Sequence, residues 1–203
     1  MVVIASPSSH IRTVSRAVAP YIDADAVMVS VTKGIEEGSL LRMSQIVAQE
    51  TGHKVVALSG PCHAEEVARD MPTLIVAGSP DEAAARKVQQ IFTTPTFRVY
   101  TNTDRRGVEL GGAVKNVIAL AVGIAMGLDY GDNAKAALIT RGNAELARLG
   151  VAMGCLLLIP AVLSLLQNPR TIDLASGWGF LTYGKVQQYL AILLSWVMPP
   201  DSP

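Results

Sequence analysis

Over its first hundred residues the chain alternates short apolar runs with amphipathic stretches, whose apolar positions recur every three or four residues. The apolar runs predict five strands, at Val2–Ala5, Ala26–Thr32, Lys54–Leu58, Thr73–Ala77 and Phe97–Tyr100. The amphipathic stretches predict four helices, at His10–Val18, Ser39–Glu50, Pro61–Arg69 and from Ser79 onward. Strands that alternate with helices indicate an α/β fold around a mostly parallel sheet.

Local signals mark two of the helix ends. Ser79 is expected to cap the fourth helix, with Pro80 in the first turn and Glu82, three residues after the serine, completing a capping box. Gly52 follows the predicted helix Ser39–Glu50 and suits the left-handed backbone conformation that ends many helices. These positions are where we expect the chain to turn between elements.

The pattern changes near residues 101–105, where the short strands stop. Two longer helical patterns follow, at Arg105–Met126 and Asn133–Gly150. We therefore predict three parts: an α/β domain over residues 1–103, a helical segment over 104–154 and a tail over 155–203.

Neither end of the chain shows a membrane or export signal. The apolar runs of the tail, Cys155–Leu166 and Tyr189–Met198, are shorter than the ~20 residues that cross a bilayer, which favours buried or interfacial helices. The N-terminus starts on a strand pattern and lacks the basic region and longer apolar core of a signal peptide. These features predict a cytoplasmic protein without a membrane span.

The charges of the chain balance, with 17 basic and 17 acidic side chains. No basic run or stripe stands out, so nucleic acid is not an expected partner. The two cysteines, Cys62 and Cys155, give no disulfide framework, and together with the scattered His10, His53 and His63 they show no metal-ligand spacing. We therefore expect no metal centre and a reducing compartment.

An unusual helical segment lies at Glu109–Asn116. It carries two glycines and a lysine inside an apolar helical pattern, although a glycine in a helix interior costs roughly 1 kcal/mol relative to alanine. Spacings of three and four residues put Glu109, Gly112, Lys115 and Asn116 on one face. A bare patch beside a lysine is typical of a small-molecule site. A tight helix crossing beside a solvated lysine is the alternative, and the segment alone leaves both open.

A second candidate group is Lys33, in the turn Val31–Gly38 directly after a predicted strand. Ligands of open α/β sheets bind beyond the carboxyl ends of the strands, and a lysine there can hold a phosphate or a carbonyl oxygen. A single Lys-Gly turn is more often only a solvated loop, so this turn alone favours that alternative.

The turn Ser59–Glu66 follows another predicted strand. Gly60 permits an unusual backbone turn, and Pro61 is expected at the first helical position, which would leave free N–H groups for an anion. The two glutamates of the turn favour the helix dipole but repel an anion, so a capped helix without a ligand is the alternative. Cys62 and His63 are adjacent and do not face each other on a helix, which argues against a nucleophile–base pair.

Four motifs follow one another along the chain: V-x-V-T-K-G-I-E-x-G, S-G-P-x-H-A-E-E, E-L-G-G-A-x-K-N-V-I-A and N-A-K-A-A-L-I-T-R-G. In this order they resemble the bacterial NAD(P)-dependent glycerol-3-phosphate dehydrogenases, from Val2 to about Gly154. The resemblance implies an incomplete Rossmann-type dinucleotide-binding domain, the start of an all-helical substrate domain and a divergent tail. It also implies the reversible reduction of dihydroxyacetone phosphate to sn-glycerol 3-phosphate with NADH or NADPH, which feeds glycerophospholipid synthesis.

The resemblance assigns roles to particular residues. Lys115 matches the catalytic lysine, which gives a proton to the developing alkoxide and needs a pKa that partial burial brings toward the working pH. The resemblance implies substrate contacts from Lys33, Gly60, Cys62, Lys115 and Asn116, and cofactor contacts from Lys33 and Ala64. Cys62 stands where the family usually has serine or threonine, and a thiol is a weaker hydrogen-bond partner.

The chain also departs from the family pattern. It has no G-x-G-x-x-[GA] turn after a strand, the turn that binds the cofactor pyrophosphate, and the central strand of the expected sheet is missing with it. The G-x-G-D-L and S-R-N-R segments expected after Gly154 are missing too. We therefore expect a truncated chain with impaired activity, an exposed edge or face at strand Val2–Ala5, and association into a homo-oligomer. A related hydroxyacid or ketopantoate-type reductase and a non-catalytic remnant are the alternatives.

Overall fold

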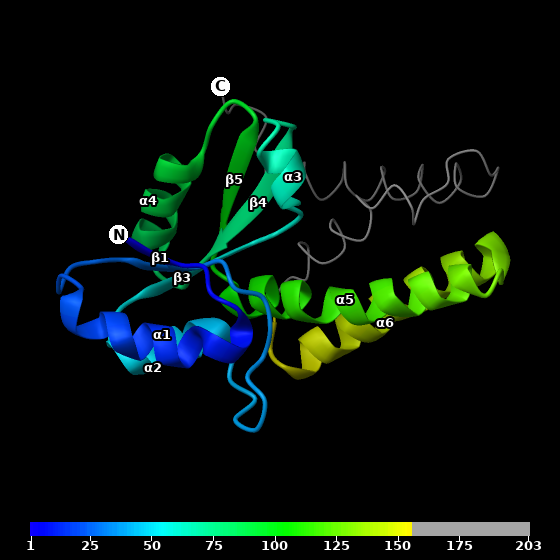
Figure 1. The fold of residues 1–203 in the computed structure, drawn as a ribbon, viewed down its shortest axis with the longest axis horizontal. Coiled ribbons are helices and arrows are strands. Elements are labelled where there is room, and N and C mark those ends of the chain that lie inside the picture. Colours follow the sequence, from blue (N-terminus) through cyan, green and yellow to red (C-terminus); the bar gives the residue numbers. More distant parts are fainter. Residues whose placement is uncertain (156–203) are drawn as a thin grey trace. The chain divides into compact units, whose positions relative to one another are not determined.

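The computed structural model describes residues 1–155. Its five-stranded sheet has the order β1-β2-β3-β4-β5 (Figure 1), with strands at Val2–Ile4, Met28–Ser30, Val55–Ser59, Thr73–Gly78 and Phe97–Asn102. The helices are α1 (Ile11–Val18), α2 (Met43–Thr51), α3 (Ala64–Val67), α4 (Glu82–Phe92), α5 (Arg105–Gly127) and α6 (Gly131–Ala152), with short 3₁₀ turns at Ser8–His10 and Ala19–Tyr21. All neighbouring strands are parallel except β3 and β4, so the predicted α/β class with a mostly parallel sheet is confirmed.

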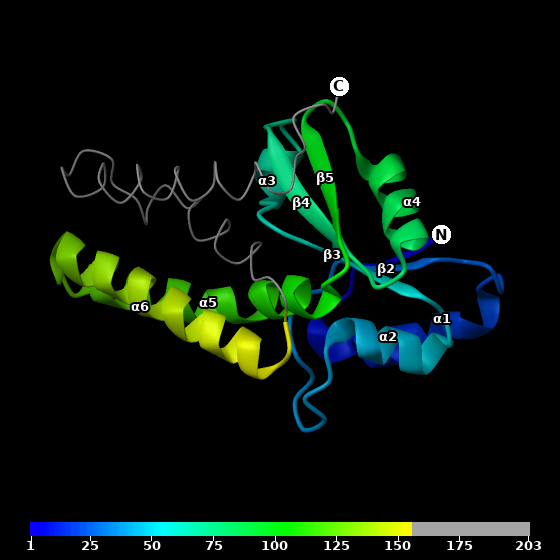
Figure 2. The same cartoon turned by 180° about the vertical axis from the view of Figure 1, so that it is seen from behind.

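Helices cover both faces of the sheet (Figure 1 and Figure 2). On one face α1 and α2 pack on a buried cluster that includes Met28 and Val55. On the other face α4 packs on a second cluster that includes Val29 and Val56. Because successive residues of a strand point to opposite faces, Met28 and Val29 belong to different clusters. Burial on both faces is the reason why the strands read as continuous apolar runs.

Strand β1 lies at the edge of the sheet and pairs with β2 alone among the described residues. Its central residue, Val3, is 41% exposed, whereas its neighbour Val29 on β2 is completely buried. Helix α4 packs on β3, β4 and β5, away from the part of the sheet that carries Val3. The predicted exposure of this strand is therefore confirmed.

The capping box predicted at Ser79 is wrong, because Asp81 caps α4 instead. The Asp81 carboxylate accepts a hydrogen bond from the Ala84 backbone N–H at 3.1 Å, and the helix begins at Glu82. Ser79 Oγ accepts a hydrogen bond from the Asp81 N–H, also at 3.1 Å, and so shapes the turn before the cap. A charged carboxylate is the stronger acceptor, and Lys54 Nζ also donates to it at 2.6 Å.

Two predicted helices begin later than expected. Helix α2 starts at Met43 rather than Ser39, because the residues before it form a hydrogen-bonded turn of their own. Helix α3 starts at Ala64 rather than Pro61 and has a single turn, so the proline lies outside it. The end of α2 is as predicted, since Gly52 closes it with a φ of 72°.

Helices α5 and α6 lie side by side (Figure 1 and Figure 2). Gly142 allows this close approach, because a Cβ there would lie 2.8 Å from the side chain of Ile118 on α5. The N-terminal part of α5 packs on the sheet through Val108, which is buried with Ala57 and Val76. Among the described residues α5 alone is long and apolar enough to cross a membrane, a weak signal that core helices share; α5 packs on β3, β4 and α6.

Candidate active site

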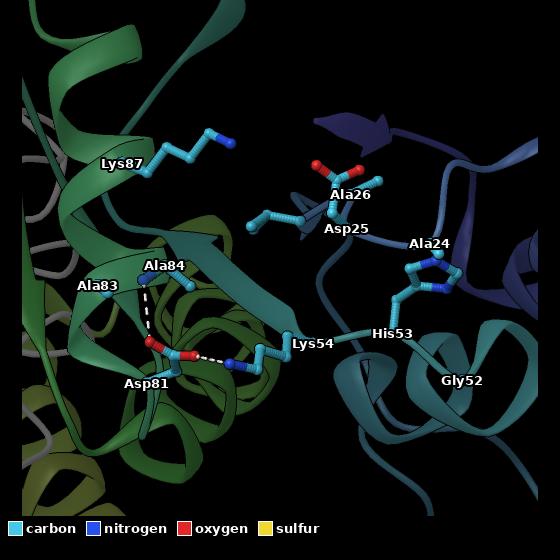
Figure 3. A pocket seen from close by; sticks show the side chains of 11 residues that line it. Ala24, Asp25, Ala26, Gly52, His53, Lys54, Asp81, Ala83, Ala84 and Lys87 are labelled. Atoms are coloured by element: carbon cyan, nitrogen blue, oxygen red, sulfur yellow. Dashed lines mark hydrogen bonds and ion pairs between the residues drawn. The ribbon is translucent and has the colours of Figure 1, made fainter.

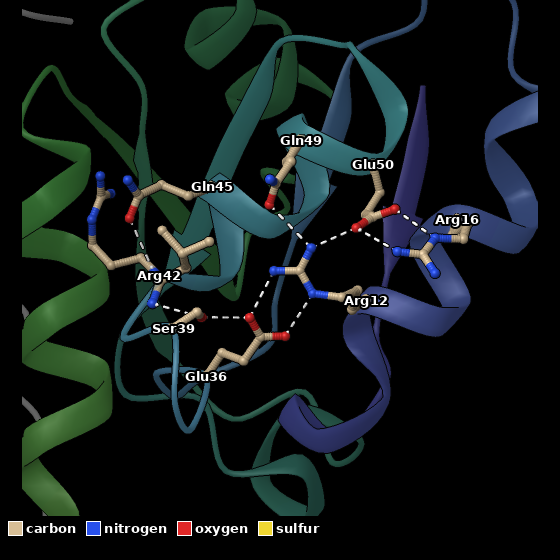
Figure 4. Close-up of polar contacts among 9 residues, drawn as sticks. Arg12, Arg16, Glu36, Ser39, Arg42, Gln45, Gln49 and Glu50 are labelled. Atoms are coloured by element: carbon tan, nitrogen blue, oxygen red, sulfur yellow. Dashed lines mark hydrogen bonds and ion pairs between the residues drawn. The ribbon is translucent and has the colours of Figure 1, made fainter.

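Lys33 lies in the turn after β2, and this turn is anchored at two places. Thr32 Oγ1 donates a hydrogen bond to Ser6 O at 2.8 Å. Arg12 of α1 donates to both carboxylate oxygens of Glu36, at 2.8 Å from Nε and 2.7 Å from Nη2 (Figure 4). Hydrogen bonds from Arg12 lower the pKa of Glu36 to about 2, so this anchor is charged throughout the physiological pH range.

The ammonium group of Lys33 reaches the turn after β3. Its Nζ donates to Gly60 O at 3.2 Å and lies 3.7 Å from Cys62 Sγ, and that Sγ lies 3.5 Å from Gly60 O. Because β2 and β3 are parallel neighbours, their carboxyl ends meet at one edge of the sheet, where α/β proteins bind ligands. The structure therefore brings together three of the residues that the sequence singled out.

Gly112 brings α5 against these two turns. A Cβ at Gly112 would lie 2.5 Å from Ser59 Oγ and 3.5 Å from Lys33 Cγ, so a larger residue would force the helix away. Tight packing thus explains the glycine. The same contact carries Lys115, three residues further along α5, toward the turn that holds Lys33.

Lys115 is half-buried beside the two turns. Burial lowers the pKa of its ammonium group, and the positive charge of Lys33 lowers that pKa further, while Cys62 acts in the opposite direction. Neither lysine forms an ion pair with a carboxylate of the described residues. Two neighbouring cations without an anionic partner are suited to a small anionic ligand.

The other predicted site residues lie further out. Ala64 and Asn116 are both exposed. The prediction that Pro61 takes the first helical position is wrong, because α3 begins at Ala64 and has only one turn. His63 Nδ1 lies 2.7 Å from Glu65 Oε2 rather than against the neighbouring thiol, in agreement with the argument against a nucleophile–base pair.

Glu109 has a structural role that the sequence analysis did not predict. Its carboxylate packs against α2 and accepts hydrogen bonds from Arg42 Nη1 at 2.5 Å, Ser44 N at 2.7 Å and Ser44 Oγ at 2.8 Å. Arg42 and Glu109 are each 8% exposed, so this ion pair is buried. It ties α5 to the start of α2, six residues before Lys115. The only sequence signal was an acidic residue inside an apolar helical pattern.

A pocket of about 520 Å³ lies at the opposite end of the strands, beside α4 (Figure 3). Its lining includes Val27 and Lys54, which directly precede β2 and β3. None of the residues that surround Lys33 and Lys115 lines it. This pocket is therefore separate from the candidate active site.

Two family models match the chain. They describe the NAD-dependent glycerol-3-phosphate dehydrogenase N-terminus, over residues 1–85, and the C-terminus of the same family, over residues 104–166. The chain belongs to this dehydrogenase family. The second match runs to residue 166, past the limit near Gly154 that the motifs indicated.

Relatives cover most of the chain, but the chain covers only part of them. It is 56% identical over 184 residues to glycerol-3-phosphate dehydrogenase (NAD(P)+) of Pelotomaculum thermopropionicum, which is 89% of this chain and 49% of that relative. For Clostridium perfringens the identity is 54% over 154 residues, with coverages of 75% and 46%. The crystal structure of glycerol-3-phosphate dehydrogenase from Coxiella burnetii matches with a TM-score of 0.75 and 36% identity, over 83% of this chain and 54% of that one. The chain thus spans about half the length of these curated relatives.

The described residues fit part of a dinucleotide site. Lys33 and the exposed Ala64 lie near the carboxyl ends of β2 and β3, at the edge where dinucleotides bind in such sheets. No glycine-rich phosphate-binding turn follows β1, β2 or β3, which continue into Ala-Ser-Pro, Val-Thr-Lys and Gly-Pro. These residues therefore suit the reactive end of a cofactor beside its substrate, and they do not suit its pyrophosphate.

Proposed function

We propose that this chain carries the substrate-binding and proton-transfer part of a glycerol-3-phosphate dehydrogenase centre. Dihydroxyacetone phosphate is the proposed substrate, sn-glycerol 3-phosphate the product, and NADH or NADPH the cofactor. The observation that carries the proposal is the convergence of Lys33 and Lys115 beside the Gly60–Cys62 turn, without a carboxylate partner among the described residues. Fixed cations of this kind stabilise a phosphorylated substrate whose carbonyl oxygen becomes negative during reduction.

Lys115 is the proposed catalytic residue. When bound, NADH or NADPH would supply the hydride that reduces the carbonyl carbon of the substrate. As the carbonyl double bond becomes a single bond, Lys115 Nζ gives a proton to its oxygen, and the neutral amine then takes a proton from solvent. Half-burial and the charge of Lys33 lower the pKa of Lys115, which favours proton release near neutral pH.

The remaining residues have binding roles in this proposal. Lys33 contacts substrate and cofactor as a positive charge, held by Gly60 O and Cys62 Sγ until a ligand is bound. In the turn after β3, Gly60 and Cys62 contact the substrate. Asn116 orients the substrate from the residue after Lys115, and the exposed Ala64 lines the cofactor side.

We further propose a cytoplasmic homo-oligomer that supplies sn-glycerol 3-phosphate for glycerophospholipid synthesis. Family membership supports the metabolic role. Exposed apolar side chains of α5, such as Val117 at 67% and Leu120 at 66%, support contact with further protein.

The deciding experiment is a reconstituted dehydrogenase. A chimera in which this chain replaces the matching part of the Pelotomaculum thermopropionicum relative should oxidise NADH or NADPH when dihydroxyacetone phosphate is added. The loss of nicotinamide absorbance reports the reaction, and Lys115→Ala in the same chimera is the control. A chimera that folds and binds cofactor without substrate-dependent oxidation would contradict the proposal and favour a non-catalytic remnant.

For the isolated chain we expect weak or undetectable binding of NADH and NADPH. The reason is that none of the strands described in residues 1–155 is followed by the glycine-rich turn that makes the main pyrophosphate contacts. Titration followed by nicotinamide fluorescence measures this, and a dissociation constant in the low micromolar range would show that other residues hold the cofactor.

A further inference from the structure

Ser59, the last residue of β3, carries a hydroxyl group in an unfavourable position. The residue is 5% exposed, and its Oγ has no hydrogen-bond partner among the described residues. A buried hydroxyl group without a partner has given up its hydrogen bonds to water and has formed none within the protein, so it destabilises the folded chain. Alanine at this position would avoid that loss, and the hydroxyl therefore calls for another explanation.

The hydroxyl lies at the base of the candidate active site. The bare Cα of Gly112 faces both Ser59 Oγ and the side chain of Lys33, since a Cβ there would lie 2.5 Å from the oxygen and 3.5 Å from Lys33 Cγ. From this point the lysine stem continues to the carbonyl of Gly60, where its ammonium group donates a hydrogen bond at 3.2 Å. Lys115 follows on α5, three residues after the glycine.

A hydroxyl group at this position can form two kinds of hydrogen bond that suit the neighbouring groups. It can accept a hydrogen bond from an ammonium group and donate one to an anionic oxygen at the same time. The stem of Lys33 lies beside it, and this side chain is long and flexible. If the ammonium group left Gly60 O for the oxygen of a ligand, the stem would shift and the hydroxyl would become accessible.

We propose that Ser59 is a further substrate-binding residue, whose hydroxyl becomes hydrogen-bonded only when a three-carbon phosphorylated substrate lies between Lys33 and Lys115. This inference rests on the proposed function. It means that Ser59 lowers the stability of the free chain and raises its affinity for substrate. Opposite effects on stability and binding are the mark of a functional polar group, because a structural one supports both.

The test compares two serines of the full chain. Ser15 of α1 is completely buried, its Oγ has no hydrogen-bond partner among the described residues either, and it serves as the matched control. Isothermal titration with sn-glycerol 3-phosphate gives the affinity, and thermal unfolding without ligand gives the stability. Ser59→Ala should unfold at an equal or higher temperature and bind about tenfold more weakly, the effect of one lost hydrogen bond to a charged ligand. Ser15→Ala should gain stability without losing affinity.

A second pair of variants separates packing from binding. Gly112→Ala places a methyl group 2.5 Å from Ser59 Oγ and should lower the unfolding temperature. Adding Ser59→Ala removes that oxygen, so the double variant should recover its stability while its affinity stays low.

Three results would overturn the inference. Unchanged affinity in Ser59→Ala would take this residue out of the site, and a joint fall in affinity and unfolding temperature would make its hydroxyl structural. In both cases the wild-type chain still binds, so the proposed function stands. A wild-type chain that does not bind sn-glycerol 3-phosphate would refute the proposed substrate site in this chain, and the inference would fall with it.

Discussion

The two halves of α5 have different surroundings, and the more apolar second half is the more exposed one. In the first half Val108 and Leu110 are 0% and 1% exposed against the α/β part, whereas in the second half Val117 and Leu120 are 67% and 66% exposed. Lys115 lies where the two halves meet and is half-buried. A reactive lysine needs this intermediate position, because it must lose part of its hydration and still reach a ligand.

The contrast shows that, within the described residues, α5 is closely packed where it meets the α/β part and incompletely packed where it meets α6. The first half of α5 is held by the sheet and by the buried ion pair of Glu109. The second half packs on α6 and leaves apolar side chains in solvent.

The largest effect on stability is expected from Glu109→Ala. The change leaves the Arg42 guanidinium buried without its partner, which costs about 3–5 kcal/mol of unfolding free energy. Urea unfolding followed by circular dichroism measures it. Val117→Ala on the exposed half is the control and should change the stability by less than about 0.5 kcal/mol. Equal losses in the two variants would show that α5 is not held mainly through its first half.

Lys115→Ala in the reconstituted chimera should lower kcat by about a hundredfold or more, the usual effect of losing a general acid. Lys115→Arg should not restore the rate, because a guanidinium keeps its proton near neutral pH. Lys87→Ala is the control, since Lys87 lines the separate pocket beside α4. Near-normal turnover of the arginine variant in a steady-state assay would show that Lys115 is not the proton donor and only positions the substrate through its charge.

Two glycines of the helical pair should respond in opposite directions. A Cβ at Gly142 would lie 2.8 Å from the Ile118 side chain, so Gly142→Ala should cost about 1–3 kcal/mol through overpacking. Gly123 has open space around it, and Gly123→Ala should stabilise by up to about 1 kcal/mol through helix propensity. Denaturant unfolding distinguishes them, and a destabilised Gly123→Ala would mean that this face of α5 is covered by protein.

The smallest effect is expected from the anchor of the Lys33 turn. Arg12 holds the pKa of Glu36 at about 2 rather than its ordinary 4.5, so the carboxylate stabilises the fold above pH 4.5. That contribution is lost as the pH falls from 4.5 toward 2. Melting temperatures across this range should therefore fall less steeply for Glu36→Gln than for the wild type. The exposed neighbour serves as the control, and an equally flattened curve for Glu37→Gln would remove the specific role of Glu36.

Element types and their order could be predicted because they depend on local patterns. The alternation of apolar runs and amphipathic stretches led to the five strands and to the helices between them, and Gly52 ended its helix as expected. Helix starts were predicted less well, because the residue that caps a helix depends on contacts outside the local pattern. At α4 the Asp81 carboxylate prevailed over the Ser79 hydroxyl, a choice that also depends on Lys54, 27 residues earlier in the chain.

The sequence by itself determined the α/β class, the family and the residues that merit attention: Lys33, Gly60, Cys62 and Lys115. Only the tertiary structure decided how they meet. The contact of Lys33 with Cys62 spans 29 residues and the ion pair of Arg42 with Glu109 spans 67, so no local pattern could specify either. The parallel pairing of β2 and β3 brings their carboxyl ends to one edge, and the missing Cβ of Gly112 lets α5 close on it. Periodicity reports which face of an element is buried, whereas the partner on the other side is set by the packing of the whole chain.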